Sequence, residues 1–446
     1  MYRNMEFVAW FRSVAPYINA FRNKIFVIAF GGEVILDGKF VDFVHDVTLL
    51  ASLGVRLVLV HGARPQIEAH LMERNLETRY VKGMRVTDTE TLQCVKESVG
   101  RIRVDIESLL SMGLANSPMA NAAIRVASGN FVTARPMGVI EGVDLMHTGE
   151  VRKIDALAIR TRLEQGDLVL LSPLGYSPTG EIFNLTLENV AAEAAIALKA
   201  EKLIFLMDAA GVEREDASSL GMILVRELTV AEGKAMLEEF ESTAPAPVGD
   251  APLYLPFAVH ACECGVPRAH LISRRVDGAL LQELFTHSGI GTMISEGPLQ
   301  ALRGAKIEDV GAILQLIEPL EANGTLVRRS RELLEMEIDR FVVIEHDKMI
   351  IGCAALYPFD NDQAAELACL TVHPNYRSTG CGEALLKNIE TRARGQGNTN
   401  LFVLTTRTAH WFIERGFREV GVDELPKAKQ GLYNYHRRSK VFLKKL

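Results

Sequence analysis

Apolar and polar positions follow two repeating patterns over residues 1–295. Continuous apolar runs of strand length, such as residues 25–30 and 55–60, predict buried β-strands. The segments between such runs, for example residues 39–54, carry apolar residues at helical spacing. Strands buried on both faces and separated by helices are typical of a mostly parallel sheet covered by helices on both sides. We therefore expect an α/β domain over residues 1–295.

The first 22 residues also place their apolar positions at helical spacing. The predicted helix rests on Phe7, Val8, Phe11, Val14, Ile18 and Phe21. Pro16 is expected to kink or divide it, because proline lacks a backbone N–H and its ring clashes with the preceding turn. The apolar face could cover its own domain or pack on a partner subunit, and the pattern leaves both open.

Residues 305–446 follow a different order. The patterns predict, in turn, a helix at 307–324, a β-hairpin at 340–359, a strand at 364–374, a helix at 382–397, a strand at 399–406, a short helix at 408–417 and a strand at 434–446. A smaller mixed α/β domain with an antiparallel hairpin is therefore expected at 305–446. Residues 296–304 are expected to be the linker between the domains.

Composition narrows the function classes. The 446 residues exceed what one core usually holds, so two or three domains are expected. A net charge of −7 argues against broad binding to nucleic acid or anionic membranes. No apolar run reaches the ~18 residues of a membrane span, and the N-terminus lacks a signal-peptide layout. The six cysteines suit a reducing, cytoplasmic setting, and the lone Cys262–Cys264 pair does not predict a metal site.

A glycine-containing loop, RSTGCG at 377–382, lies between a predicted strand and a predicted helix. Helix N-terminal amides attract phosphate, and Arg377 adds a cation. With this context, residues 303–446 resemble GNAT acetyltransferases, in which such a loop holds the pyrophosphate of acetyl-CoA. The resemblance implies acetyl-CoA as cosubstrate and no metal. The implied contacts are Leu370, Val372, Arg377, Ser378, Thr379, Gly380, Cys381 and Gly382.

Amine acetylation needs a base, because an ammonium group has no lone pair with which to attack. Glu366 opens the strand that would lie beside the thioester, and it is the candidate base. Many GNAT enzymes use a tyrosine as general acid, but Phe412 occupies that position here. Thr405 is the preferred substitute, with Thr406 and Tyr433 as alternatives.

The stretches LFVLTTRTAHWFIERGF and LYNYHRRSKVF further resemble the bacterial N-acetylglutamate synthases. The resemblance implies L-glutamate as substrate, attacking acetyl-CoA directly in the first step of arginine biosynthesis. Two carboxylates call for arginine forks, and two basic clusters offer Arg328, Arg329, Arg331, Arg437 and Arg438. By resemblance, Arg329 is assigned to the α-carboxylate and Arg438, with Ser439, to the side-chain carboxylate. Cys369 is also assigned to the substrate site.

Residues 1–295 resemble the amino acid kinase family, most nearly acetylglutamate kinase, with three altered motifs. Ala29 and Phe257 stand where these kinases carry lysines, and Arg64 replaces a glycine. Asp208 keeps the family's aspartate. Phosphoryl transfer depends on electrostatic stabilisation, to which each lysine should contribute a few kcal/mol. We therefore expect the fold without kinase chemistry, with an active fused kinase or a non-catalytic arginine sensor as alternatives.

The same resemblance implies an allosteric site for arginine in this domain, with feedback inhibition. A carboxylate suits a guanidinium, and turn amides suit a carboxylate. The candidate contacts are Tyr17, His270, Glu283, Gly289 and Gly291. The resemblance also implies ring-like homo-oligomers, expected to be hexamers, built through the kinase-like domain and its N-terminal helix.

Overall fold

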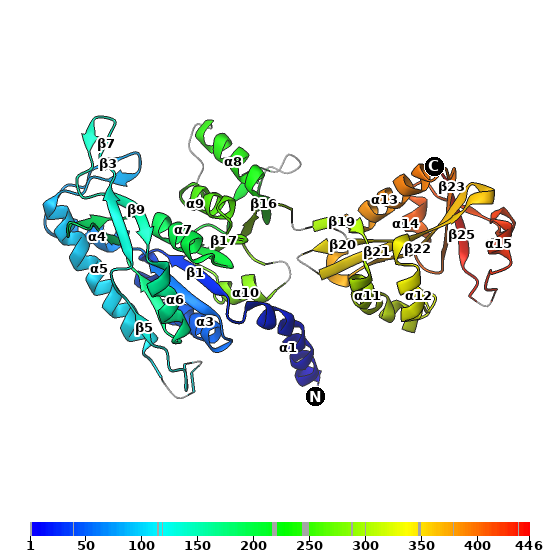
Figure 1. Cartoon of the computed structure of the whole chain (residues 1–446), viewed down its shortest axis with the longest axis horizontal. Coiled ribbons are helices and arrows are strands. Elements are labelled where there is room, and N and C mark those ends of the chain that lie inside the picture. Colours follow the sequence, from blue (N-terminus) through cyan, green and yellow to red (C-terminus); the bar gives the residue numbers. More distant parts are fainter. Residues whose placement is uncertain are drawn as a thin grey trace. The chain divides into compact units, whose positions relative to one another are not determined.

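The computed structural model describes residues 2–38, 40–113, 116–117, 119–215, 221–242, 249–286, 289–298, 300–346, 349–377, 379–435 and 437–446. The chain divides into two compact units, Met1–Gly297 and Pro298–Leu446 (Figure 1). Each unit has its own sheet and its own core, and each is described by itself.

An eight-stranded sheet forms the centre of the first unit. Its strands are, in spatial order, β16 (Glu227–Thr229), β18 (Thr292–Ser295), β17 (Arg268–Ser273), β13 (Lys202–Met207), β1 (Ile25–Phe30), β2 (Arg56–His61), β10 (Leu168–Leu171) and β5 (Val126–Ala127). Every neighbouring pair is parallel except β17 and β18. The sheet confirms the predicted mostly parallel α/β architecture.

Helices cover both faces of this sheet (Figure 1). They are α1 (Tyr2–Phe21), α2 (Glu33–Leu36), α3 (Phe40–Ser52), α4 (Arg64–Glu73), α5 (Thr89–Leu110), α6 (Ala156–Glu164), α7 (Leu187–Leu198), α8 (Val230–Ser242), α9 (Ala251–Glu263) and α10 (Ala279–Phe285). Alternate residues of β1 enter opposite cores: Val27 packs with α6, α7 and α9, whereas Phe26 and Ile28 pack with α3, α5 and α10. Burial on both faces explains the unbroken apolar run of this strand.

Short strands complete the first unit. They are β3 (Tyr80–Val81) with β4 (Met84–Arg85), β7 (Val139–Ile140) with β8 (Val143–Asp144), β14 (Glu213–Glu215) with β15 (Met222–Leu224), and a four-stranded sheet of β12 (Ile182–Asn184), β11 (Leu174–Tyr176), β6 (Val132–Pro136) and β9 (Gly149–Ile154).

Helix α1 continues through Pro16 without division. Its C-terminal half covers its own domain, since Val14 and Phe21 are buried in the core shared with α3 and α10. Toward its N-terminus, Phe7 and Phe11 are 60% and 54% exposed, and their rings stack. The helix therefore both covers its domain and presents apolar surface.

The second unit is built on a seven-stranded sheet. Its order is β19 (Gln300–Gly304), β20 (Phe341–His346), β21 (Met349–Phe359), β22 (Ala364–Val372), β23 (Asn400–Thr405), β25 (Lys440–Lys445) and β24 (Arg418–Val420). The helices are α11 (Val310–Ala322), α12 (Arg331–Met336), α13 (Cys381–Gly395), α14 (Ala409–Ile413) and α15 (Lys427–Gln430). One core joins α13 and α14 to one face of the sheet, and another joins α11 and α12 to the opposite face.

The start of the second unit differs from the expectation in one respect. Residues 300–304, placed in the linker by the sequence pattern, form strand β19 and pair antiparallel with β20 along their whole length. The strand is short and mostly exposed at the sheet edge, and its sequence, QALRG, lacks the apolar run of a buried strand. Among the described residues, none of the helices combines the length and apolar character needed to cross a membrane.

Candidate active site

Strands β22 and β23 pair only at their beginnings. Their parallel register joins Ala364–Glu366 to Asn400–Phe402, although β22 continues to Val372 and β23 to Thr405. Beyond Glu366 the two strands diverge, and a cavity of about 1000 Å³ lies between them, here called the β22–β23 cavity. Residues 367–372 of β22 line it, so the facing edge of this strand is available to a ligand.

A β-bulge shapes the β22 side of this cavity. The pairing with β21 shifts register after Cys353, and Cys369 has a left-handed φ of 53°. Such bulges bend a strand and redirect its side chains. Cys369, Leu370 and Val372 all line the cavity, as their assignment requires. Burial raises the pKa of the Cys369 thiol to about 11, so this group stays neutral and is a poor nucleophile.

The predicted phosphate loop opens helix α13. Gly380 is the N-cap residue with a φ of 86°, a conformation that favours glycine. Arg377, Gly380 and Gly382 line the cavity. The loop is held internally, because the Thr379 hydroxyl donates to the Tyr376 carbonyl at 2.6 Å.

Two other described members of the predicted loop contact set, Thr379 and Cys381, are not among the residues that line the cavity. Cys381 is buried, and its thiol accepts a hydrogen bond from Gln300 at 3.2 Å. Thr379 turns inward to the Tyr376 carbonyl, and it is absent from the lining residues. Ser378 lies outside the described residues. The loop therefore offers backbone amides of the first turn of α13 together with the Arg377 cation.

Glu366 stands where the two strands part, and it lines the cavity. Its Oε2 atom lies 2.6 Å from Nζ of Lys429, which comes from α15 on the cavity wall. The two side chains are only 12% and 21% exposed. Sequence reasoning named Glu366 but missed Lys429, which belongs to a four-residue helix without any apolar periodicity.

The candidate general acids differ in position. Thr405 lines the cavity, and its hydroxyl oxygen accepts a hydrogen bond from the Thr408 backbone N–H at 3.2 Å. Thr406 is exposed and is not a lining residue. Tyr433 also lines the cavity, but its hydroxyl donates to the Ser439 carbonyl at 2.6 Å.

The two arginine clusters each place one guanidinium at the cavity. Arg329 and Arg437 line it, and so does the buried Ser439. Arg437 also donates to the carbonyls of Gly324 and Thr325, at 3.2 and 2.8 Å. Arg438, the residue assigned by resemblance, is exposed, has a φ of 48° and is not among the lining residues. The structure thus brings the neighbouring Arg437 into the cavity instead.

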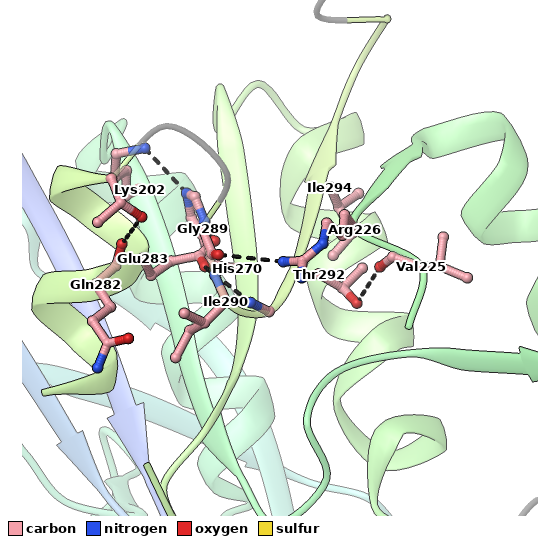
Figure 2. A network of polar contacts seen from close by, with 12 residues as sticks. Lys202, Val225, Arg226, His270, Gln282, Glu283, Gly289, Ile290, Thr292 and Ile294 are labelled. Carbon is pink, nitrogen blue, oxygen red and sulfur yellow. Dashed lines mark hydrogen bonds and ion pairs between the residues drawn. The ribbon is translucent and has the colours of Figure 1, made fainter. Parts of the chain in front are cut away.

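A second polar cluster lies within the first unit (Figure 2). His270 on β17 contacts Lys202 Nζ through Nε2 at 3.1 Å and Glu283 Oε1 through Nδ1 at 2.7 Å. The ammonium must donate to Nε2, so the imidazole is neutral with its proton on Nδ1, facing Glu283. Burial first, and then Lys202, lower the pKa of His270 to about 4.

Glu283 links this cluster to the turn at Gly289 and Gly291. Its Oε2 atom accepts hydrogen bonds from the backbone N–H groups of Ile290 and Gly291, at 2.7 and 3.0 Å (Figure 2). Burial alone raises the pKa of Glu283, but the His270 and backbone hydrogen bonds outweigh it and lower the pKa to about 2. Gly289 has a φ of 55°, so the turn favours glycine there.

Tyr17 of α1 reaches the same region through aromatic contacts. Its ring lies 6.2 Å from that of Phe21, and Phe21 in turn packs edge-on against Phe285 of α10. The Lys202 ammonium lies 5.4 Å from the centre of the Phe21 ring. The structure therefore joins the residues predicted for arginine binding through a continuous set of contacts, and Lys202 is the member that sequence reasoning missed.

The carboxyl ends of β1 and β2 border a second, smaller cavity of about 220 Å³. Gly31, Gly62, Arg64 and Asp208 line it. Ala29 is fully buried within β1 and offers no charge. Phe257 lies in α9 and packs, half-buried, against the core of the unit.

In the loop after β13, charged side chains of the chain itself already bind the backbone amides and the aspartate that a phosphate site would use. The Asp250 carboxylate accepts from the backbone N–H groups of Asp208 and Ala209, at 2.6 and 3.1 Å. Asp208 is ion-paired with Arg274, and with Arg275 at 3.6 Å. These contacts occupy the family's aspartate and its loop with partners from the chain itself.

Comparisons with known proteins agree with both units. A model of the amino acid kinase family matches residues 24–273, and a model of the acetyltransferase (GNAT) domain matches residues 337–419. An amino-acid acetyltransferase of Azotobacter vinelandii is 53% identical over 99% of this chain and 100% of its own length. One of Ralstonia nicotianae is 52% identical over 99% of this chain and 96% of its own length.

Among solved structures, N-acetylglutamate synthase from Neisseria gonorrhoeae complexed with coenzyme A and L-arginine matches with a TM-score of 0.86 and 38% identity, over 99% of both chains. The same protein complexed with coenzyme A and N-acetyl-glutamate matches with a TM-score of 0.61, at the same identity and coverage. The identities and coverage extend over both units rather than one of them. The chain therefore belongs to the amino acid kinase family and, over nearly its whole length, to the amino-acid acetyltransferases, and it is an acyltransferase.

Proposed function

We propose that this protein is an N-acetylglutamate synthase, which transfers the acetyl group of acetyl-CoA to the α-amino group of L-glutamate. The observation that carries the proposal is the β22–β23 cavity, whose lining brings together the Glu366 carboxylate, Arg329 and Arg437, and the N-terminus of α13. The relative from Neisseria gonorrhoeae, which binds coenzyme A and N-acetyl-glutamate, supports both the donor and the product.

In this proposal the phosphate end and the thioester end of acetyl-CoA lie at different parts of the cavity. The loop 377–382 and the first turn of α13 hold the pyrophosphate, with Arg377 supplying charge. The open edge of β22, residues 367–372, pairs with the pantetheine arm through backbone groups. The thioester then lies near Glu366, where the strands part.

The reaction we propose is direct attack within a ternary complex. Glu366 accepts a proton from the substrate ammonium, and the freed amine attacks the thioester carbonyl carbon. The carbon–sulfur bond breaks as the tetrahedral intermediate collapses, and Thr405 supplies a proton to the departing thiolate. The second proton lost by the amine nitrogen restores the Thr405 hydroxyl, which leaves the neutral amide. Cys369 is neutral and buried, which argues against an acetyl-cysteine intermediate.

Selectivity for glutamate follows, in this proposal, from two guanidinium groups on different segments. Arg329 is assigned to the α-carboxylate, and Arg437, in place of Arg438, is assigned with Ser439 to the side-chain carboxylate. A substrate lacking one carboxylate leaves an arginine of the cavity wall without its partner. Sites built in this way reject neutral analogues strongly.

The first unit is proposed to regulate rather than to phosphorylate. Ala29 and Phe257 supply no cations, and Asp208 and its loop are engaged by Arg274 and Asp250. Phosphoryl transfer relies on such cations. We propose instead that arginine binds at the cluster of Tyr17, His270, Glu283, Gly289 and Gly291, with Lys202, and inhibits the acetyltransferase.

Regulation between the two units requires that arginine bias a change of domain or subunit geometry. The exposed rings of Phe7 and Phe11 on α1 support packing of this helix on a partner subunit. A homo-oligomer, proposed to be a hexamer, is the assembly in which this would act. The cytoplasm is the proposed location, since all six cysteines are free thiols.

The test is release of free thiol from acetyl-CoA by the full chain across a panel of amino acids, with and without arginine. Glutamate is expected to be the preferred acceptor, and arginine is expected to lower the rate. Thiol release with no amino acid above the rate without acceptor would overturn the proposal.

A further inference from the structure

Lys429 forms the closest charged contact of the proposed base. Its Nζ atom lies 2.6 Å from Oε2 of Glu366, and both residues line the β22–β23 cavity. The substrate's ammonium group must approach the same carboxylate to give up its proton. Lysine and the reactive end of the substrate carry the same chemical group, an alkylammonium ion. Lys429 thus occupies the position that the substrate amine needs.

The surroundings of Lys429 allow this contact to exchange. Helix α15 has only four residues, Lys427–Gln430, and it contains no buried residue. The helix is tied to the domain through Gln430, whose side-chain amide donates to the carbonyls of Asp423 and Leu425, at 3.0 and 2.7 Å. Lys429 itself has a flexible four-carbon stem, so its ammonium can move while the helix stays anchored.

The charges around Glu366 indicate which group the displaced Lys429 ammonium would contact next. At the proposed substrate end, the cavity lining includes Arg329, Arg437 and Lys429 together with the carboxylate of Glu366. The other lining carboxylate, Glu383, belongs to the first turn of α13 beside the phosphate loop. Glutamate brings one ammonium and two carboxylates. When its ammonium pairs with Glu366, Lys429 loses its partner and a carboxylate of the substrate supplies a new one. A partly buried cation left unpaired is costly, so the two exchanges are coupled.

We propose that Lys429 is a positioning residue that holds Glu366 until the substrate's ammonium replaces it on binding, and that Lys429 then turns to a carboxylate of the substrate. This inference rests on the proposed function, because it takes glutamate as the acceptor. The exchange makes a dicarboxylic amino acid the preferred substrate, because its two carboxylates together supply partners for Arg329, Arg437 and Lys429.

A purely structural ion pair is the competing explanation, and Lys427 provides the matched control. It lies on the same short helix, is exposed and is not among the residues lining the cavity. Lys429→Met removes the charge and keeps most of the side-chain length, Lys429→Arg keeps the charge, and Lys427→Met tests the helix alone. Steady-state kinetics of the full-length chain would give kcat and KM for glutamate, glutamine and acetyl-CoA.

Lys429→Met is expected to raise the KM for glutamate at least tenfold, to change the KM for acetyl-CoA less than threefold, and to reduce the preference for glutamate over glutamine. Lys429→Arg should restore most of the glutamate KM, and Lys427→Met should match the unaltered protein. Equal losses for glutamate and glutamine, or no rescue by arginine, would overturn the inference. If the unaltered protein fails to acetylate glutamate at all, the proposed function fails instead, so the two failures are distinguishable.

Discussion

Replacing Glu366 by glutamine tests the proposed base with little change in shape. The substitution keeps the side-chain volume and a hydrogen-bond acceptor facing Lys429, but it removes the group that takes the proton. General base catalysis is worth about 10²–10⁴-fold in rate, or about 3–5 kcal/mol of activation free energy. Because the Glu366 side chain is only 12% exposed, bulk water has little access to this position and is a poor substitute for the carboxylate as the base. We therefore expect kcat to fall by at least ~100-fold.

The assay is thiol release from acetyl-CoA as a function of pH. The unprotonated fraction of glutamate rises about tenfold per pH unit below the pKa of its amine, so less help from a base is needed at high pH. The deficit of Glu366→Gln should accordingly shrink between pH 7 and pH 9. Glu383→Gln is the matched control, because Glu383 lines the same cavity from α13.

Two outcomes would refute this reasoning. One is a kcat for Glu366→Gln within threefold of the unaltered protein. The other is a kcat deficit that stays constant from pH 7 to pH 9. At pH 9 more of the amine is already unprotonated, so loss of the base should lower kcat less. An equal kcat loss for Glu383→Gln would point to the charge of the cavity rather than to the base.

Three further predictions concern the substrate and the regulatory cluster. Arg437→Ala should raise the KM for glutamate at least ~10-fold by removing a charge-assisted hydrogen bond, whereas the neighbouring Arg438→Ala should change it less than twofold; equal effects in steady-state kinetics would contradict the placement. Burial lowers the pKa of His270 from 6.5 to about 4, so its contribution to stability is present above pH 6.5 and is lost as pH falls toward 4. Between pH 7 and pH 5 this loss is about 2 kcal/mol, measured by urea unfolding, and His270→Gln should abolish it; an unchanged pH slope in that variant would refute the assignment. Glu283→Gln should raise the arginine concentration for half inhibition at least tenfold while leaving the uninhibited kcat within twofold, and an unaltered arginine response would exclude Glu283 from the site.

The fold was largely predictable from the sequence, because strands such as Ile25–Phe30 are buried on both faces and therefore read as continuous apolar runs. Glu366 and the loop at Gly380 were found because their chemistry is tied to a strand and a helix that periodicity locates. The edge strand Gln300–Gly304 was placed in a linker because an exposed strand has little apolar pattern to detect.

Lys429 and Arg437 could not be found in this way. Lys429 meets a carboxylate from a distant strand, and its own four-residue helix carries no periodic signal. The difference between Arg437 and Arg438 depends on the local turn, in which Arg438 has a positive φ and is not among the residues that line the cavity. Adjacent arginines in a sequence carry no information about which of them a turn directs inward.

The most direct test of the central claim follows the acetyl group itself. The full chain would be incubated with isotopically labelled acetyl-CoA and glutamate, with free thiol and acetylated product quantified together by absorbance and mass spectrometry. The account predicts one labelled N-acetylglutamate for each thiol released, and at least ~100-fold lower kcat/KM with glutamine, consistent with a site that pairs both carboxylates. Thiol release without labelled N-acetylglutamate, or equal labelling of glutamate and glutamine, would contradict it.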